Sequence, residues 1–260
     1  MPSIEGGGVE KNLMIIANFL AKKIDNLSLI TVSKTYKSKF DNKINFISTK
    51  NNWDRFGRKI KYLIALYLLV KEIIKNDNKV VFAFQANIYC IILCKLFNTK
   101  IIVRSNSSPS GWSKNFLKNI IFEYILGLAN KIIVNSLVFQ KELNKKFNVK
   151  SICIYNPLNI SQIQILSRKK QVNKIKTNGL KIINVGRFTD QKDHITLLKA
   201  INILKNKFQI NLLIIGRGVN KNKMLKYIIT KKLKKIVTIK NFTNNPYPNI
   251  KNAELMILSS

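Results

Sequence analysis

The sequence is poor in acidic residues, histidine and cysteine, and each shortage removes a class of site. It has 12 Asp and Glu against 46 Lys and Arg, one His and three Cys. No D-x-D pattern occurs, so the carboxylates that usually chelate a metal are lacking. Cys90, Cys94 and Cys153 lie in apolar runs, without CxxC spacing or a His partner. We therefore expect no metal, no cofactor and no disulfide framework, and a reduced, cytoplasmic environment.

Long hydrophobic runs are also missing. The longest unbroken apolar run is residues 62–70, well short of the roughly 18 to 20 residues that a membrane-spanning helix needs. The more hydrophobic stretch at 80–97 is interrupted by Gln85, Asn87 and Lys95, and is better explained as a buried strand followed by a helix. The first residues, MPSIEGGGVEKN, do not have the pattern of a secretory signal. These features predict a cytoplasmic protein without a membrane span.

The positive charge is large but evenly spread. The formal net charge is +34, yet only six of the 46 basic residues are Arg, and the Lys are scattered along the chain. Aromatic residues interleaved with Arg, as on a nucleic-acid-binding strand face, are not found. A compositional bias on solvated faces therefore explains the charge better than a nucleic-acid surface, and we expect no nucleic-acid partner. A general attraction to anionic lipid is compatible with this interpretation.

Apolar strands and helices alternate along the chain, which predicts an α/β fold with parallel sheets covered by helices on both faces. In the first half we expect helices at 9–23, 53–75, 87–97 and 112–129, and strands at 27–33, 79–84, 100–105, 131–136 and 151–156. In the second half we expect strands at 181–186, 210–216, 235–242 and 254–260, and helices at 194–208, 221–233 and 248–252.

A polar, basic stretch divides the two series. Residues 167–179 lack an apolar period, as is typical of a linker between domains. We therefore expect a first Rossmann-like domain at 1–166, a linker at 167–179 and a second domain at 180–260. Two such halves facing each other across a cleft is the architecture that this order implies.

The segment IINVGRFTDQK, residues 182–192, carries the strongest chemical signal. An apolar strand ends in Gly186 and is followed at once by two cations, Arg187 and Lys192. Asp193 can cap the next helix, whose N-terminus would face the same ligand. Paired cations at a helix N-terminus suit a diphosphate. The competing interpretation is two solvated cations after a strand, because short motifs often occur by chance.

The segment and its surroundings resemble the family 4 glycosyltransferases of the GT-B fold. The donor domain of that family opens with a strand, then G-R-[LF]-x-x-Q-K, then a helix; here the matching residues are Gly186, Arg187, Phe188, Gln191 and Lys192. LLIIGRG at 212–218 and NNPYPNIKNAELMILSS at 244–260 resemble later segments of the family, in the same order.

The resemblance implies a hexosyl transfer from a nucleotide sugar, with retention at the anomeric carbon. Arg187 and Lys192 would then stabilise the negative charge that grows on the leaving phosphate, without a metal. Gly186, Gly216 and Gly218 would line the nucleotide side, and Phe242 would border the base, although an ordinary turn and a core aromatic compete with these roles. His194, the only histidine, is expected to support the site rather than to react.

The first domain offers fewer signals for the acceptor. Gly6, Gly7 and Gly8 resemble the family's G-G-x-E-R loop, with Lys11 in place of the usual Arg; a flexible tail is the alternative. Many family members place a His after the strand at 100–105, where this chain has Asn106, which can donate a hydrogen bond but cannot act as a base. Arg104 is either a cation for an acceptor phosphate or a cleft-edge residue.

Both ends look shortened beside the family pattern. Few residues precede the glycine loop, and the E-x7-E segment that usually grips the donor sugar would follow residue 260. The first expectation is thus a glycosyltransferase acting on a glycan or lipid-linked acceptor, represented by an inactive fragment. The alternatives are a module that at most binds a nucleotide and, least favoured, a basic nucleic-acid-binding protein.

A membrane surface is a further candidate partner. The stretch at 111–131 combines Trp112, Phe116, Leu117 and Ile120 with Lys114 and Lys118. One helix face can therefore rest on lipid headgroups while the other packs on the sheet, at the inner face of the plasma membrane. Burial of the whole stripe in the core is the expectation that we favour over this one.

Overall fold

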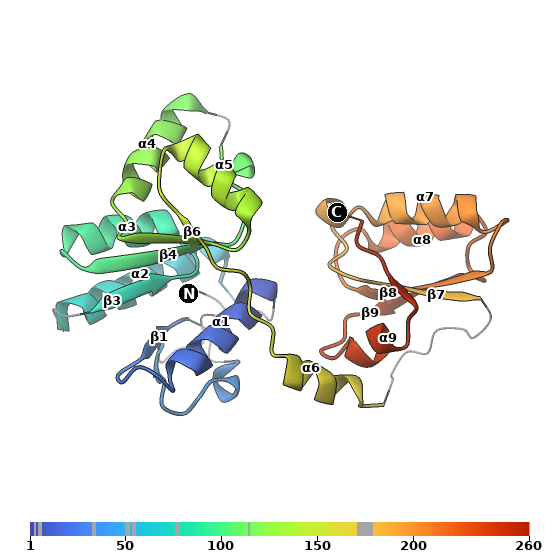
Figure 1. Cartoon of the computed structure of the whole chain (residues 1–260), viewed down its shortest axis with the longest axis horizontal. Coiled ribbons are helices and arrows are strands. Elements are labelled where there is room, and N and C mark those ends of the chain that lie inside the picture. The colour runs from blue at the N-terminus through green and yellow to red at the C-terminus, as the bar shows by residue number, and fades with distance from the viewer. Residues whose placement is uncertain are drawn as a thin grey trace. The chain divides into compact units, whose positions relative to one another are not determined.

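The computed structural model describes residues 1–2, 4, 7–32, 35–49, 53, 56–75, 79–113, 115–170 and 179–259. The chain forms two compact units, Met1–Leu158 and Asn159–Ser260. Both are α/β with parallel strands, as the sequence predicts (Figure 1).

In chain order, the described helices and strands of the first unit are α1 (Gly8–Leu20), β1 (Ser28–Ile30), η1 (Lys37–Lys39), β2 (Asn45–Ile47), α2 (Arg58–Lys75), β3 (Val80–Ala83), α3 (Asn87–Leu96), β4 (Lys100–Ser105), η2 (Pro109–Gly111), α4 (Phe116–Gly127), β5 (Lys131–Val134), α5 (Leu137–Phe147) and β6 (Ile152–Cys153). The η elements are single turns of 3-10 helix.

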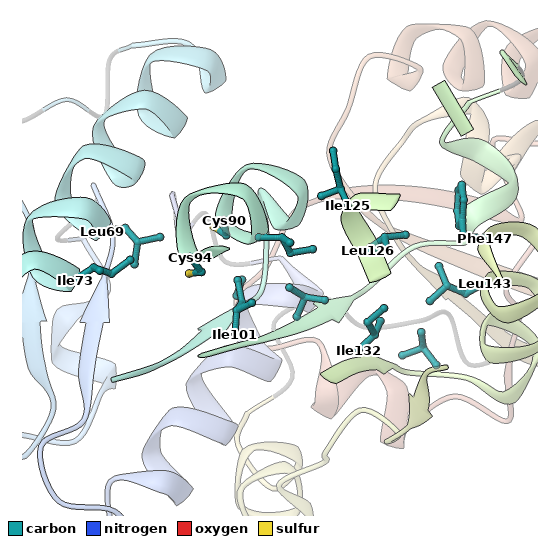
Figure 2. Packing of buried hydrophobic residues seen from close by; sticks show 14 residues of the cluster. Leu69, Ile73, Cys90, Cys94, Ile101, Ile125, Leu126, Ile132, Leu143 and Phe147 are labelled. Atoms are coloured by element: carbon teal, nitrogen blue, oxygen red, sulfur yellow. The ribbon is translucent and has the colours of Figure 1, made fainter. Parts of the chain in front are cut away.

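The main core of this unit lies on one face of the parallel sheet β3-β4-β5-β6. Helices α2, α3, α4 and α5 supply its buried side chains, and Figure 2 shows them meeting Ile101 of β4 and Ile132 of β5. These strands are apolar because helices cover them. The carboxyl ends of the strands, where polar residues follow, are thereby left at one edge of the sheet.

A second cluster packs around α1, on the other side of the strands in Figure 1. It joins Leu13 and Ala17 of α1 to Leu29 of β1 and to Phe84, which follows β3. β1 pairs in parallel with β2 in a two-stranded sheet separate from the four-stranded one. The Val32 amide donates to the Pro2 carbonyl, so the start of the chain lies beside the end of β1.

The described helices and strands of the second unit follow: α6 (Ile160–Ser167), β7 (Leu180–Val185), η3 (Asp190–Lys192), α7 (His194–Leu204), β8 (Ile210–Gly216), α8 (Lys221–Thr230), β9 (Val237–Asn241), α9 (Tyr247–Lys251) and β10 (Leu255–Met256). The sheet has the order β10-β7-β8-β9, all parallel. Every residue of β8 is buried, because this central strand is covered on both faces.

Apart from the three 3-10 turns, the sequence predicts most of these elements but misses three. Helix α5 was not expected between the strands at 131–136 and 151–156, nor were β2 and α6. The inward residues of α5, Phe139, Leu143 and Phe147, recur at helical spacing, so this helix was overlooked although the sequence carries its apolar period. The helix expected from residue 53 begins at Arg58, and that expected at 194–208 ends at Leu204.

The units divide after Leu158, whereas the sequence suggests a boundary after residue 166. Helix α6 packs against α9 of the second unit, and the Asn245 side-chain amide donates to the Leu166 carbonyl at 3.0 Å. Most of the expected linker, residues 171–178, lies outside the described residues. The assignment of acceptor and donor roles to the two halves stays a prediction.

The expected burial of the apolar stripe near α4 is wrong for three of its four residues. Phe116, Leu117 and Ile120 are exposed, because α4 turns Ile125 and Leu126 to the sheet instead. Trp112 does pack inward, with its ring centroid 5.6 Å from that of Phe147.

Candidate functional site

The turn after β7 is the first part of the site, and main-chain hydrogen bonds fix it to the turn after β8. The Gly186 amide donates to the Ile215 carbonyl at 3.1 Å, and the Phe188 amide donates to the Arg217 carbonyl at 2.9 Å. In return the Asn220 amide donates to the Phe188 carbonyl at 3.0 Å. Residues 186–188 and 215–220 are therefore held as one pair of loops at the carboxyl edge of the sheet.

The side chain of Phe188 anchors this pair of loops to the core of the unit. Its side chain is fully buried and belongs to the core of the unit, whereas the preceding Arg187 is exposed. A buried aromatic ring fixes the turn through its large apolar contact area. Burial of Phe188 thus directs the Arg187 cation into solvent at the end of β7, where the sequence predicts a binding role.

Two glycines allow the loops to approach so closely. A Cβ at residue 216 would collide with the Gly186 carbonyl oxygen and lie 2.7 Å from Cε1 of Phe188. A Cβ at residue 218 would collide with the Phe188 carbonyl oxygen, and Gly218 has φ +153°, which side chains rarely adopt. The structure thus gives Gly216 and Gly218 a packing reason, while their contact with a donor remains a prediction.

The chain from Asp190 to His194 leads into α7. Residues 190–192 form η3, and Asp193 caps α7 as expected, its carboxylate accepting from the Thr196 amide at 3.2 Å. The hydrogen bonds to Thr196 lower the pKa of the Asp193 carboxyl. Ser259 Oγ donates to the Lys192 carbonyl at 2.8 Å, which ties this turn to the segment after β10. The first turn of α7 thus lies beside Lys192.

His194 is 2% exposed, and its ring packs edge-on against Phe188 with centroids 5.2 Å apart. Both ring nitrogens lack a hydrogen-bond partner within the described part of the chain. Burial lowers the pKa of His194, so the neutral ring is favoured. A Cβ built on Gly186 would lie 3.9 Å from both His194 Nε2 and Lys192 Cγ. Gly186, Lys192 and His194 therefore meet at one point.

Arg217 and Phe242 lie just after β8 and β9, at the same carboxyl edge of the sheet. The Arg217 guanidinium lies 4.7 Å from the centroid of the Phe242 ring, and Phe242 is 47% exposed. The alternative that Phe242 is a core aromatic is thus wrong. Sequence reasoning assigned no role to Arg217, although its position between two glycines after a strand repeats the pattern of Gly186 and Arg187.

In the first unit a polar cluster lies at the end of β4. Arg104 is 1% exposed; its guanidinium donates to the Ile154 carbonyl at 3.1 Å and to Asn156 Oδ1 at 3.0 Å. Burial lowers the pKa of Arg104. Asn106 donates to the Phe84 carbonyl at 3.1 Å, and Asn87 donates to the Arg104 carbonyl at 3.0 Å. Arg104 thus joins β4 to the segment after β6, and its contact with an acceptor stays a prediction.

Three polar atoms of this cluster have no partner among the described residues. They are Nε of Arg104 and the side-chain oxygens of Asn87 and Asn106, all of them buried. Buried polar groups are usually hydrogen-bonded, so such atoms require an explanation. Amide oxygens accept hydrogen bonds and thus suit a hydroxyl group or a water molecule.

The glycine loop lies at the start of α1. Gly7 is the N-cap and Gly8 the first residue of the helix, while Gly6 lies outside the described residues. A Cβ at Gly7 would meet the Glu10 carboxylate at 2.6 Å. An acidic side chain therefore already occupies the first turn of this helix, near its partial positive charge.

The described residues contain no group of three or more His, Cys, Asp and Glu that could hold a metal ion. Among the same residues, no helix is both long and apolar enough to cross a membrane.

Comparisons with known proteins agree with this geometry. Residues 167–260 match the family described as "Glycosyl transferases group 1". The chain is 24% identical over 271 residues to the N-acetylgalactosamine-N,N'-diacetylbacillosaminyl-diphospho-undecaprenol 4-alpha-N-acetylgalactosaminyltransferase of Campylobacter jejuni, covering 99% of this chain and 72% of that protein. It is 29% identical over 220 residues to an uncharacterized glycosyltransferase of Methanocaldococcus jannaschii, covering 77% of this chain and 54% of that one.

Among solved structures, Anabaena HepE in complex with UDP superposes with a TM-score of 0.70 at 12% identity, covering 98% of this chain and 71% of that chain. A glycosyltransferase from Rickettsia africae gives a TM-score of 0.67 at 18% identity, covering 98% and 70%. At such identities the likeness shows the fold alone. The chain has the α/β fold of GT-B glycosyltransferase structures, and its residues 167–260 match the group 1 glycosyl transferases.

Proposed function

We propose that this chain moves a hexosyl group from a nucleotide sugar to a glycan or lipid-linked acceptor, with retention at the anomeric carbon. The observation that carries the proposal is the turn after β7, which presents exposed Arg187 and the neighbouring Lys192 on a backbone fixed by buried Phe188. In this reaction the bond from the anomeric carbon to the diphosphate oxygen breaks. The acceptor hydroxyl forms the new bond and loses its proton, and negative charge passes to the diphosphate.

The donor's diphosphate is assigned to Gly186, Arg187, Lys192 and the N-terminus of α7. Two cations and the positive end of a helix stabilise the charge of the leaving group most strongly when they are fixed before the reaction. His194 lies beside Gly186, buried and without a partner among the described residues, so that it can bond a donor group or orient Lys192.

The nucleoside is assigned to the loop after β8 and to the end of β9. Gly216 and Gly218 let the main chain of this loop pack closely on residues 186–188, and Phe242, held by Arg217, offers an exposed ring face to a base. Solved structures of Anabaena HepE carry UDP and UDP-glucose, which supports a uridine nucleotide as the first donor to test.

The acceptor is assigned to the first unit. Asn106 and Asn87 hold buried amide oxygens that can accept from sugar hydroxyls, with Arg104 beside them and Gly7 and Gly8 at the start of α1. The name of the Campylobacter relative includes a diphospho-undecaprenol acceptor, which supports a lipid-linked acceptor. Such an acceptor implies a cytoplasmic protein at the inner face of the plasma membrane.

The test is calorimetry of UDP binding to the chain and to the double variant Arg187→Ala, Lys192→Ala. We expect the double variant to lose most of the affinity, because both cations serve one dianion, and added Mg²⁺ to change little. The matched control is Arg168→Ala, Lys199→Ala, which removes the same charge from two exposed cations of the same unit. Unchanged affinity in the first variant, or an equal loss in the control, would contradict the assignment.

Transfer itself is tested with UDP-linked sugars and a polyprenyl diphosphate sugar as acceptor, with the anomeric configuration of the product read by NMR. An α-linked product from an α-linked donor supports retention, and an inverted product contradicts it. UDP binding without transfer from any donor would favour the alternative, a chain that binds a nucleotide and does not react.

A further inference from the structure

Helices α2, α3 and α4 lie side by side in the first unit, since α3 packs against both α2 and α4. Their inner sides form the core over β4 and β5, as Figure 2 shows for Leu69, Cys90 and Leu126. Their outward side, here called the α2–α4 face, belongs to residues 58–75, 87–96 and 116–127. A solvated outward side should be polar. On all three helices it is apolar instead.

Helix α4 exposes the largest side chains. Phe116 is 76% exposed, Leu117 69% and Tyr124 71%, with Ile120 and Ile121 exposed between them. The spacing of these residues puts them on one face of the helix. Three turns of α4 thus present a continuous apolar stripe that the fold itself does not use.

The same holds for α2 and α3. Leu63 and Tyr67 of α2 are 68% and 66% exposed, and Leu96 of α3 is 74% exposed. A groove of about 310 Å³ runs between the two helices, and its lining is Leu66, Tyr67, Val70, Tyr89, Ile92 and Leu93. No ionisable group other than the two tyrosines lines it. Apolar surfaces of this extent mark an interaction site rather than ordinary solvated surface.

Exposed cations lie on the same three helices. Lys59, Lys71, Lys95 and Lys118 are exposed on the three helices, and Lys118 Nζ lies 5.8 Å from the Phe122 ring centroid. The described carboxylates of these helices are Glu72 and Glu123, both half-buried, and Glu72 is already bonded to Lys75 and Lys79. The exposed charge of the α2–α4 face is therefore positive.

We propose that the α2–α4 face docks on an anionic lipid membrane, with the apolar side chains in the acyl boundary and the lysines at the headgroups. Leucine and phenylalanine flanked by tyrosine and lysine is the composition of helices that lie in a membrane interface. A second copy of the chain fits less well, since two such faces would bring their lysines together, within a chain of net charge +34. The proposal deepens the membrane location that the lipid-linked acceptor implies and in that respect rests on the proposed function, but it does not depend on the donor chemistry.

The test is cosedimentation of the full chain with vesicles of phosphatidylglycerol and phosphatidylcholine, and with vesicles of phosphatidylcholine alone. The apolar variant is Leu63→Ser, Leu96→Ser, Leu117→Ser. Its matched control is Leu158→Ser, Ile165→Ser, Ile203→Ser, which changes three side chains of similar exposure (73%, 62% and 68%) outside the face. Because all six are exposed, the fold should persist, which circular dichroism checks.

We expect the chain to bind the anionic vesicles, and the apolar variant to bind at least about tenfold more weakly, because three inserted side chains are lost. The control should bind like the chain itself. Replacing Lys59, Lys71, Lys95 and Lys118 by Gln should weaken binding by about fivefold for each lysine near the surface. The control for that variant replaces Lys150, Lys199, Lys226 and Lys234, which are also exposed.

Several outcomes would overturn the proposal. These are no binding to anionic vesicles, equal binding by the apolar variant, equal losses in variant and control, or binding that high salt leaves unchanged. Sedimentation velocity without lipid tests the other occupant: a dimer that the apolar variant dissociates would assign the face to a second copy. The Arg187→Ala, Lys192→Ala variant should bind vesicles like the unchanged chain. Vesicle binding and UDP binding therefore test the two proposals separately, and either proposal can fail without the other.

Discussion

The turn after β7 in the second unit is fixed by its main chain, whereas the polar cluster after β4 in the first unit is fixed by its side chains. Around Phe188, amides and carbonyls of residues 186–188 and 215–220 bond to each other and leave Arg187 exposed. At the end of β4, the side chains of Arg104 and two asparagines make the bonds; Arg104 is buried and the asparagines are half-buried. The first arrangement presents charge to a ligand; the second retains buried acceptors and excludes charge from solvent.

The largest expected effect tests the main-chain arrangement. Gly216→Ala places a Cβ against the Gly186 carbonyl and the Phe188 ring, so the two loops must separate. We expect a loss of about 3 kcal/mol in the free energy of unfolding of the second unit, the upper range for overpacking. Hydrogen exchange of the β7 and β8 amides measures it, because exchange reports each unit separately.

The control for this variant is Gly127→Ala at the end of α4. A Cβ there meets nothing within 4 Å, and alanine favours the helix by up to about 1 kcal/mol over glycine. Equal protection of β8 in both variants would show that close approach of the loops is not what holds the turn.

The next effect tests the side-chain arrangement. Arg104→Ala removes both donors from the Ile154 carbonyl and Asn156 and should cost about 2 kcal/mol, since hydrogen bonds from charged groups count for more than neutral ones. The readout is hydrogen exchange of the β4 and β5 amides. Arg104→Met keeps the apolar stem and removes the buried charge, so we expect a smaller loss. If both variants match the unchanged chain, Arg104 does not join β4 to the segment after β6.

These two arrangements also differ in what the sequence reveals. The turn at 186–192 was predictable because its signals are local: an apolar strand, a glycine, two cations and the capping Asp193. The burial of Arg104 was not, because its partners Ile154 and Asn156 are 50 and 52 residues away. Contact between Phe188 and the loop at 217–220, some 30 residues on, was equally hidden. Local patterns predict elements and caps, whereas burial of a charge depends on tertiary contacts.

The missed helix α5 departs from this rule. Its inward residues Phe139, Leu143 and Phe147 recur at helical spacing, a local signal that the sequence does carry. The α2–α4 face shows the opposite failure: its apolar residues predict burial, and the structure exposes them. A hydrophobic pattern indicates that a face needs a partner, but it does not say whether that partner is the protein's own core.

A smaller effect tests the cap that orients α7. Asp193 has φ +36°, a left-handed conformation that favours glycine, and it accepts from the Thr196 amide. Asp193→Ala loses the cap and keeps the unfavourable backbone, so we expect about 1 kcal/mol of lost stability in the second unit. Asp193→Gly loses the cap but relieves the backbone, and should cost only a few tenths. Hydrogen exchange of the α7 amides measures both, and a costlier Gly variant would contradict this explanation.

The smallest effect is the pH dependence that His194 gives to the second unit. Burial, reinforced by Lys192 and opposed by Asp193, lowers the pKa of His194, so the folded state holds the neutral ring. Below the ordinary value of about 6.5 the unfolded chain binds this proton more readily than the folded one, and stability falls as the pH falls. The contribution is fully present above pH 6.5 and is lost towards the folded pKa.

Protection of the β7 and β8 amides, corrected for intrinsic exchange, should therefore decrease from pH 7 to pH 5.5, and His194→Gln should flatten this decrease. The buried Met1 amine, with its pKa lowered to about 6, has the same sign but belongs to the first unit, where the variant should change nothing. If protection changes equally with pH in the chain and in the variant, the His194 ring is not held neutral against Phe188. The turn after β7 would then be less shielded from water than the burial of Phe188 and His194 implies.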